Sequence, residues 1–452
     1  MVDKLTRIYS EFRKIMTIIR KYYYKINPKL EVPFEEFKRR QKAVIDALHS
    51  EGFDVGIVFS DEHYCGDVPY LGGNINISIE QVAGVIGKTG FHIVAGLEGG
   101  YVAEQLANRA GAKVHKVELL KLADEEYPIE AEKLEDIIEA AADKKINEIK
   151  KIALLTPKQI IPASIIEYLY NIFGSEKVID AHELYCKIKY EKSDIEMKLI
   201  EQASIIADAM MEAMISVIKP GMLETEVAAW GYFVARELGA EDDGFKVMVG
   251  ANTANRTLIG PALNREIQEG DFVHLGVAPK RDGLNACVRR SVVVVSSPDK
   301  LTEEQRFWFE FIEEAYKVAF FKFVDVAKKD LPGKEIEIAV NEFYKEKSGD
   351  ISKKFGISVN LEKLKPYTCV HNTGYTECQE FYGAITLKTE NTLGNQIAVM
   401  IDVALKGFGQ TMDEKIIPNL EYIVIENTIG KFGRDIKTFS QLPLNCQYLV
   451  KY

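Results

Sequence analysis

Two short apolar stretches carry side chains suited to a catalytic or binding site. His274 precedes Gly276 by two residues in VHLGVAP, and Asn285, Cys287 and Arg289 alternate in GLNACVRR. Residues two apart share one face of a strand, so His274 should face the space beside Gly276, and the other three should share a face. Histidine can accept and return a proton near neutral pH, and the planar donors of arginine suit an anion. We therefore expect a catalytic His274 and substrate contacts from Asn285, Cys287 and Arg289; a core histidine, a buried thiol and a solvent-facing arginine are the simpler alternatives.

A third polar segment, HNTGYTECQEFYG, begins at His371. His371 is a second candidate proton carrier, and Glu377 or Glu380 could act as a general acid or base. A solvated loop is the alternative for these two acids. Tyr375 could donate a hydrogen bond to a developing oxyanion, or it could simply fill a cavity.

Composition bounds the class of protein. The chain has 452 residues, of which 47% are hydrophobic and 28% are charged, and a formal net charge of -11. This length and composition indicate two folded domains. The negative charge argues against a nucleic-acid partner, which would need clustered basic residues, so a small-molecule substrate is expected. Six cysteines without CxxC spacing indicate neither a disulfide scaffold nor a zinc ribbon, and they favour a cytoplasmic location.

The N-terminal segment, residues 3–24, alternates apolar and basic residues with the period of an amphipathic helix. It could dock on its own chain, on a partner subunit or on an anionic membrane, and docking on protein is favoured. Basic residues interrupt it too often for a signal peptide. No apolar run is long enough for a membrane span.

The remaining elements predict an α/β (α+β) protein. Apolar runs at 55–59, 82–86, 91–95 and 152–155 alternate with helical stretches and indicate a small mixed α/β domain. After the charged linker 187–198, two helix-rich blocks each lead into strand-like runs. Each block also contains a Pro-Gly turn. This repetition predicts a pseudo-symmetric domain with its site between the halves.

Several short motifs in this second part occur in a familiar order. They are KSDIEMKLIEQASIIADAM, IKPGMLETEVAAW, EGDFV at 269–273, RRS at 289–291, HNTG at 371–374 and the strand 393–403. In this order they resemble the creatinase/aminopeptidase P/methionine aminopeptidase superfamily, which includes prolidase-like Xaa-Pro peptidases. The resemblance implies an N-terminal extension (1–34), a creatinase-like N-terminal domain (35–186) and a C-terminal domain with the pita-bread fold (187–452).

The resemblance also implies a site for two divalent ions, held by two aspartates, one histidine and two late glutamates. Here the aspartate positions fall on Gly276 and Cys287, and the histidine position falls on Tyr375. Ile259 and Tyr382 stand where aminopeptidase P and prolidase have further histidines. The usual two-ion site therefore cannot form.

The two late acids remain. They are identified as Asp402 in VMIDVAL and Glu421 in LEYIVIE, with Asp413 as the alternative to Glu421. We favour no metal and no cofactor. If one divalent ion is bound, Asp402 and Glu421 would hold it, with Cys287 or His274.

Creatinase, which works without a metal, is the precedent for such a site. We therefore expect a hydrolase or lyase that cleaves a C–N or related bond of a small anionic, amino-acid-like substrate. His371 or His274 would move the proton, Asp402 and Glu421 would orient water, and Arg289 would hold the anion. The alternatives are an atypical single-metal Xaa-Pro aminopeptidase-like enzyme and a catalytically silent binding protein. Resemblance to creatinase also implies a homodimer.

Overall fold

The chain divides into two units. In the computed structural model, residues 4–73, 75, 80–124, 126, 130–253 and 259–451 are described. The larger unit comprises Met1–Leu30, Lys192–Thr373 and Gly383–Tyr452, and the smaller comprises Glu31–Glu191 and Gly374–Tyr382. Residues 1–30 thus belong to the larger unit, and residues 374–382 join the smaller one although the sequence suggested the C-terminal domain. Among the described residues, no helix is long and apolar enough to cross a membrane.

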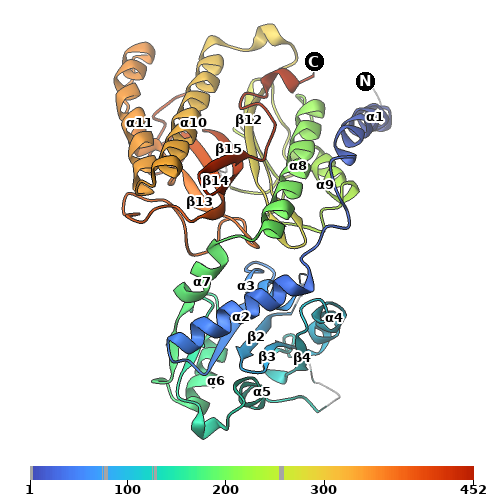
Figure 1. The fold of residues 1–452 in the computed structure, drawn as a ribbon. Helices are drawn as coiled ribbons and strands as arrows, with labels where there is room; N and C mark the ends of the chain where they lie inside the picture. Colours follow the sequence, from blue (N-terminus) through green and yellow to red (C-terminus); the bar gives the residue numbers. More distant parts are fainter. Residues whose placement is uncertain are drawn as a thin grey trace. The chain divides into compact units, whose positions relative to one another are not determined.

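The smaller unit is built on a mixed sheet in the order β4-β3-β2-β1-β5-β6 (Figure 1). The apolar runs expected to be strands form β1, β2, β3 and β5, and helices α5 and α6 pack Ile138 and Leu169 into the same core. Its strands are β1 (Val55–Ser60), β2 (Val82–Gly87), β3 (Gly90–Ala95), β4 (Lys113–Lys116), β5 (Ile152–Leu154) and β6 (Val178–Asp180). Its helices are α2 (Phe34–Ser50), α3 (Asp67–Gly72), α4 (Leu97–Ala107), α5 (Leu134–Ala142), α6 (Ala163–Phe173) and α7 (His182–Tyr190).

A buried ionic network links distant segments of the smaller unit. Lys189 Nζ lies 2.6 Å from Asp67 Oδ1 and 3.3 Å from Glu380 Oε2. Thr156 donates a hydrogen bond to Asp67, and Thr376 donates one to Glu380. Burial opposes the charge of Lys189, but the two carboxylates outweigh it and raise its pKa. Glu380 is therefore a buried ion-pair partner and not a residue of a solvated loop.

The larger unit contains an antiparallel sheet in the order β13-β14-β15-β12-β9-β8, with β16 paired to β15 (Figure 1). A small second sheet has the order β11-β10-β7. The strands are β7 (Asp242–Asp243), β8 (Met248–Ala251), β9 (Asp271–Val277), β10 (Pro279–Arg281), β11 (Leu284–Asn285), β12 (Val288–Val294), β13 (Val370–Asn372), β14 (Gln396–Lys406), β15 (Tyr422–Phe432) and β16 (Asp435–Thr438). The helices are α1 (Lys4–Tyr23), α8 (Asp194–Val217), α9 (Glu224–Glu237), α10 (Glu303–Lys329) and α11 (Lys334–Phe355).

Two helices cover one face of the large sheet. α8 packs against β9 and β12, where Val273 and Leu275 join its apolar core, and α10 packs against β14 and β15. On β15, Asn427 donates a hydrogen bond to Tyr316 of α10, so residue 427 also faces the helices. Because side chains alternate along a strand, Glu426 must point to the opposite face. Glu426 thus lies on the face of the sheet opposite α8 and α10, in the pita-bread arrangement expected from the sequence.

Both helices begin at sequence-encoded caps. Ser193 and Glu196 form a capping box at the start of α8, in which each side chain accepts a hydrogen bond from the backbone N–H of the other. Thr302 and Gln305 do the same for α10. These contacts satisfy N–H groups that the first turn leaves without helical partners, which sets where each helix starts.

Helix α1 packs on its own chain. Ile15, Ile18 and Ile19 are buried in the core that contains α8 and α9. Tyr22 donates a hydrogen bond of 2.8 Å to Glu212 of α8. Of the docking modes left open by the sequence, the structure thus shows docking of this helix on its own chain.

This packing gives a stability prediction. Ile15 is 0% exposed, and truncating a buried isoleucine removes its apolar contacts and leaves a cavity. Ile15→Ala should therefore lower the free energy of unfolding by about 2–4 kcal/mol, measured by urea denaturation followed by circular dichroism. Leu5→Ala on the same helix is the control, because Leu5 is 63% exposed. Equal stability of the two variants would mean that α1 does not pack on α8 in solution.

Candidate active site

Four residues form a row across the face of the large sheet opposite α8 and α10. Gly276 on β9 is the direct partner of Arg289 on β12, Arg289 is the partner of Glu426 on β15, and Glu426 is the partner of Asp402 on β14. Direct cross-strand partners have side chains on one face, close enough to interact. Three of these four residues are charged, and we call the four together the charged row.

The row contains two carboxylates side by side. Both Asp402 and Glu426 are buried. Tyr367 donates a hydrogen bond of 3.0 Å to Asp402 Oδ1. Burial and the neighbouring Glu426 raise the pKa of Asp402, and the positive charge of Arg289 only partly offsets them. Two adjacent buried acids resist full ionisation unless a cation lies close to them.

Arg289 supplies one such cation. Its Nη1 lies 3.3 Å from Asp402 Oδ2, and its Nε lies 3.8 Å from Glu426 Oε2. Its Nη1 also donates to the Tyr367 hydroxyl at 3.1 Å, and its Nη2 donates to the Tyr422 hydroxyl at 2.8 Å. The guanidinium is thus engaged with acids of its own chain, which differs from the substrate-anion contact expected for it.

His371 lies beside the same acids. On β13, its Nε2 is 3.5 Å from Glu426 Oε1. One donor atom each from His371, Asp402 and Glu426 lies within 4.8 Å of the others. The structure thus brings together three of the expected residues, His371, Asp402 and Arg289, and adds Glu426.

His274 is on the same face but is ill suited to carry a proton. It is buried, and its ring meets the Tyr422 ring edge-on at a centroid distance of 5.3 Å. Burial and the nearby Arg289 charge lower its pKa to about 3. The imidazole is therefore neutral at physiological pH, and its Nε2 finds no hydrogen-bond partner among the described residues.

Cys287 and Asn285 are fully buried. The backbone N–H of Cys287 donates to the Thr428 hydroxyl, which in turn donates to the Cys287 carbonyl. The Cys287 side chain packs against Ala278 and Met400 in a small apolar cluster. This setting fits the buried-thiol alternative. Asn285 lies on β11, outside the strand that carries Arg289.

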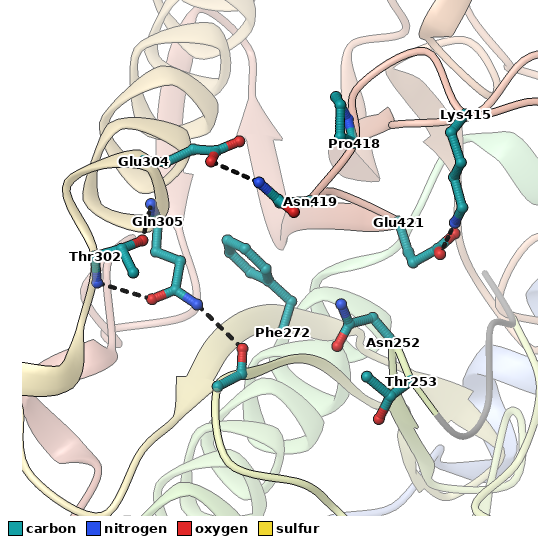
Figure 2. Close-up of a pocket in the computed structure, with 11 residues that line it drawn as sticks. Asn252, Thr253, Phe272, Thr302, Glu304, Gln305, Lys415, Pro418, Asn419 and Glu421 are labelled. Carbon is teal, nitrogen blue, oxygen red and sulfur yellow. Dashed lines mark hydrogen bonds and ion pairs between the residues drawn. The ribbon is translucent and has the colours of Figure 1, made fainter. Parts of the chain in front are cut away.

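Glu421 lies apart from the other acids. It precedes β15, forms an ion pair with Lys415, and lines a cavity of about 700 Å³ together with Phe272, Asn252 and Asn419 (Figure 2). Asp413, the alternative to Glu421, is exposed in the loop before β15. The acid that faces Asp402 is Glu426, which the sequence reading missed, together with Tyr367 and Tyr422.

Tyr375 and Glu377 belong to the smaller unit. There, the Tyr375 hydroxyl accepts a hydrogen bond of 3.0 Å from Arg40 Nη1, and its ring meets Tyr70 edge-on. Tyr375 is buried by these contacts. A catalytic role for Tyr375 or Glu377 stays a prediction.

Sequence comparison supplies the family. Residues 198–429, just over half of the chain, match metallopeptidase family M24. An Xaa-Pro dipeptidase of Pyrococcus horikoshii is 29% identical over 242 residues, which cover 53% of this chain and 64% of that protein. An Xaa-Pro dipeptidase of Pyrococcus furiosus is 32% identical over 155 residues, which cover 34% of this chain and 42% of that protein. The matches thus span less than two thirds of either relative.

Solved structures of the same fold cover nearly all of the chain. The X-Pro aminopeptidase of Thermotoga maritima has a TM-score of 0.69 at 18% identity, over 90% of this chain and 99% of that one. The prolidase of Pyrococcus horikoshii has a TM-score of 0.67 at 20% identity, over 90% of this chain and 100% of that one. At such low identity these likenesses establish the fold alone.

The relatives correct one expectation from the sequence. A creatinase-like reaction on a non-peptide C–N bond was expected because hairpin metal ligands are missing, but the two Pyrococcus relatives matched by sequence are Xaa-Pro dipeptidases. The names of these relatives thus favour a peptidase over a reaction on a non-peptide bond. By its match over residues 198–429, the chain belongs to metallopeptidase family M24.

Proposed function

We propose that this protein hydrolyses short peptides, with dipeptides as the substrate class, and that it uses one divalent cation. The observation that carries the proposal is the group of three donors, His371, Asp402 and Glu426, on adjacent strands and on the sheet face opposite α8 and α10. The names of the similar dipeptidases support the substrate class.

A two-ion site does not fit these residues. Gly276 has no side-chain donor, so of the two hairpin positions only Cys287 offers one, a buried thiol whose Sγ lies within 4.8 Å of a Glu426 carboxylate oxygen. Two carboxylates and one histidine, each on a different strand, are too few ligands to surround two ions.

A single ion does fit. One imidazole and two carboxylates form a donor set that suits divalent first-row metals. Glu426 Oε1 is buried and accepts no hydrogen bond from the described residues, although His371 Nε2 is 3.5 Å away. A cation held by His371, Asp402 and Glu426 would satisfy this oxygen. When bound, such an ion polarises a carbonyl and lowers the pKa of water.

The surrounding residues keep the acids in place. Tyr367 donates to one oxygen of Asp402, while Arg289 contacts the other. The Tyr422 hydroxyl accepts a hydrogen bond from Arg289 and lies 2.5 Å from the Tyr367 hydroxyl. These contacts leave the acids little freedom to rotate, which favours a pre-organised site.

The test is turnover of dipeptides with and without a cation. We expect chelation to abolish release of proline from Xaa-Pro dipeptides, and one equivalent of Mn²⁺ or Zn²⁺ per chain to restore it, as measured by mass spectrometry. Dipeptides with the order reversed, Pro-Xaa, are the matched control for specificity. Undiminished turnover after chelation would exclude the cation, and dipeptide binding without any hydrolysis would leave a binding protein.

A further inference from the structure

The position of Arg289 depends on the absence of a side chain at its neighbour. A Cβ added to Gly276 would lie 3.3 Å from Arg289 Cγ and 3.1 Å from Met248 Sδ, which is tighter than ordinary van der Waals contact. Arg289 and Gly276 are direct cross-strand partners. The aliphatic part of Arg289 therefore uses the space that a side chain at position 276 would need.

From this position the guanidinium reaches one side of the carboxylate pair. It lies nearest to Asp402 Oδ2 and Glu426 Oε2. The other oxygen of Glu426, Oε1, faces His371. The two oxygens of Glu426 thus face two different partners, one an arginine and the other the histidine of the three-donor group.

The charges of the row require this cation. Asp402 and Glu426 together carry up to two negative charges in a buried setting, where an uncompensated carboxylate is costly. Arginine keeps its proton at any physiological pH, so it neutralises one of these charges permanently. A single divalent ion beside His371 would be enough to balance the one negative charge that remains.

We propose that the Arg289 guanidinium is a built-in cation that takes the place of one metal ion, so that the site accepts one divalent ion and not two. The identity of the remaining ligand as a divalent ion rests on the proposed function. The role of Arg289 rests on its own contacts with Asp402, Glu426 and Gly276.

Calorimetric titration of chelator-treated protein with Mn²⁺ tests this role without measuring activity. The wild-type chain should bind one ion. Arg289→Met removes the charge but keeps an apolar side chain, and it should bind Mn²⁺ at least tenfold more tightly or accept a second equivalent. Arg289→Lys, which keeps a positive charge, should bind one ion with an affinity closer to that of the wild type.

The outcomes separate this inference from the proposed function. Equal affinity and stoichiometry of Arg289→Met and wild type would overturn the role of Arg289 and leave the single-ion peptidase intact. If only Arg289→Met binds Mn²⁺, the role of Arg289 is supported and the cation of the proposed function is lost.

The wild-type protein provides a second test if Arg289→Met does not fold. Anomalous diffraction from crystals soaked in Mn²⁺ should place one ion beside His371, with Arg289 still against Asp402 and Glu426. Two ions, or an ion in place of the guanidinium, would overturn the inference.

Discussion

Glu426→Gln is expected to lower kcat/KM for a dipeptide at least ~100-fold and to weaken Mn²⁺ binding at least ~10-fold, since changing even a residue that only supports a metal ligand costs about that much. The amide cannot offer two anionic oxygens, so it loses the charge that faces both His371 and Arg289. Steady-state kinetics and calorimetry on the same preparation measure the two effects.

Glu421→Gln is the matched control. Glu421 is also a glutamate of the same segment, but its carboxylate pairs with Lys415 in the loop before β15. We expect kcat/KM within about threefold of wild type, because a partly exposed ion pair contributes little. If Glu421→Gln were the more damaging variant, the acid of the site would be the one that the sequence suggested first.

Lys189→Met is expected to lower the free energy of unfolding by about 3–5 kcal/mol, because it leaves the buried carboxylates of Asp67 and Glu380 without their cation. Urea denaturation followed by circular dichroism measures the loss. Burial already raises the pKa of Asp67, and removing Lys189 would raise it further. A carboxyl whose folded pKa is raised destabilises the fold as pH increases, so the deficit should be largest near neutral pH and smaller below about pH 4.

Lys187→Met on the same helix is the control for this change. Lys187 is 55% exposed and pairs with Glu183, whereas the Lys189 side chain is 4% exposed. An exposed pair of this kind is worth about 0–1 kcal/mol. Similar losses in the two variants, or a Lys189→Met deficit that does not shrink in acid, would show that the buried network does not carry the stability assigned to it.

The fold was predictable because its signals are local. Helix caps such as Ser193 with Glu196, the Pro-Gly turns and the alternating strands each leave a pattern within a few residues. Their order along the chain was enough to recognise the superfamily, which the family match confirms, and the solved structures confirm the fold.

The site was predicted less well because it depends on register between distant strands. The sequence reading chose Glu421, at the edge of an apolar run, although Glu426 lies inside it, opposite Asp402. A usable signal was present. Asp402 and Glu426 are both acids within otherwise apolar strands, IAVMIDVAL and YIVIE, and an acid is seldom buried in such a strand unless it has a partner, so its presence there indicates a functional site.

Two other differences have a similar physical origin. The chain leaves the large sheet after Thr373, so Tyr375 and Glu377 fall in the smaller unit, and no local pattern marks this transition. Burial, together with the nearby charge of Arg289, lowers the pKa of His274 to about 3. Strand alternation alone predicts neither this burial nor the proximity of Arg289.

The contact between Gly276 and Arg289 also limits how the site can evolve. An aspartate at position 276 would require Arg289 to shift by a few tenths of an ångström, because Arg289 Cγ lies 3.3 Å from the place of its Cβ. Loss of Arg289 alone leaves Asp402 and Glu426 without the cation that they contact. Substitutions at 276 and 289 should therefore be epistatic, and Gly276→Asp should be better tolerated when Arg289 is replaced by a smaller side chain than when it is present.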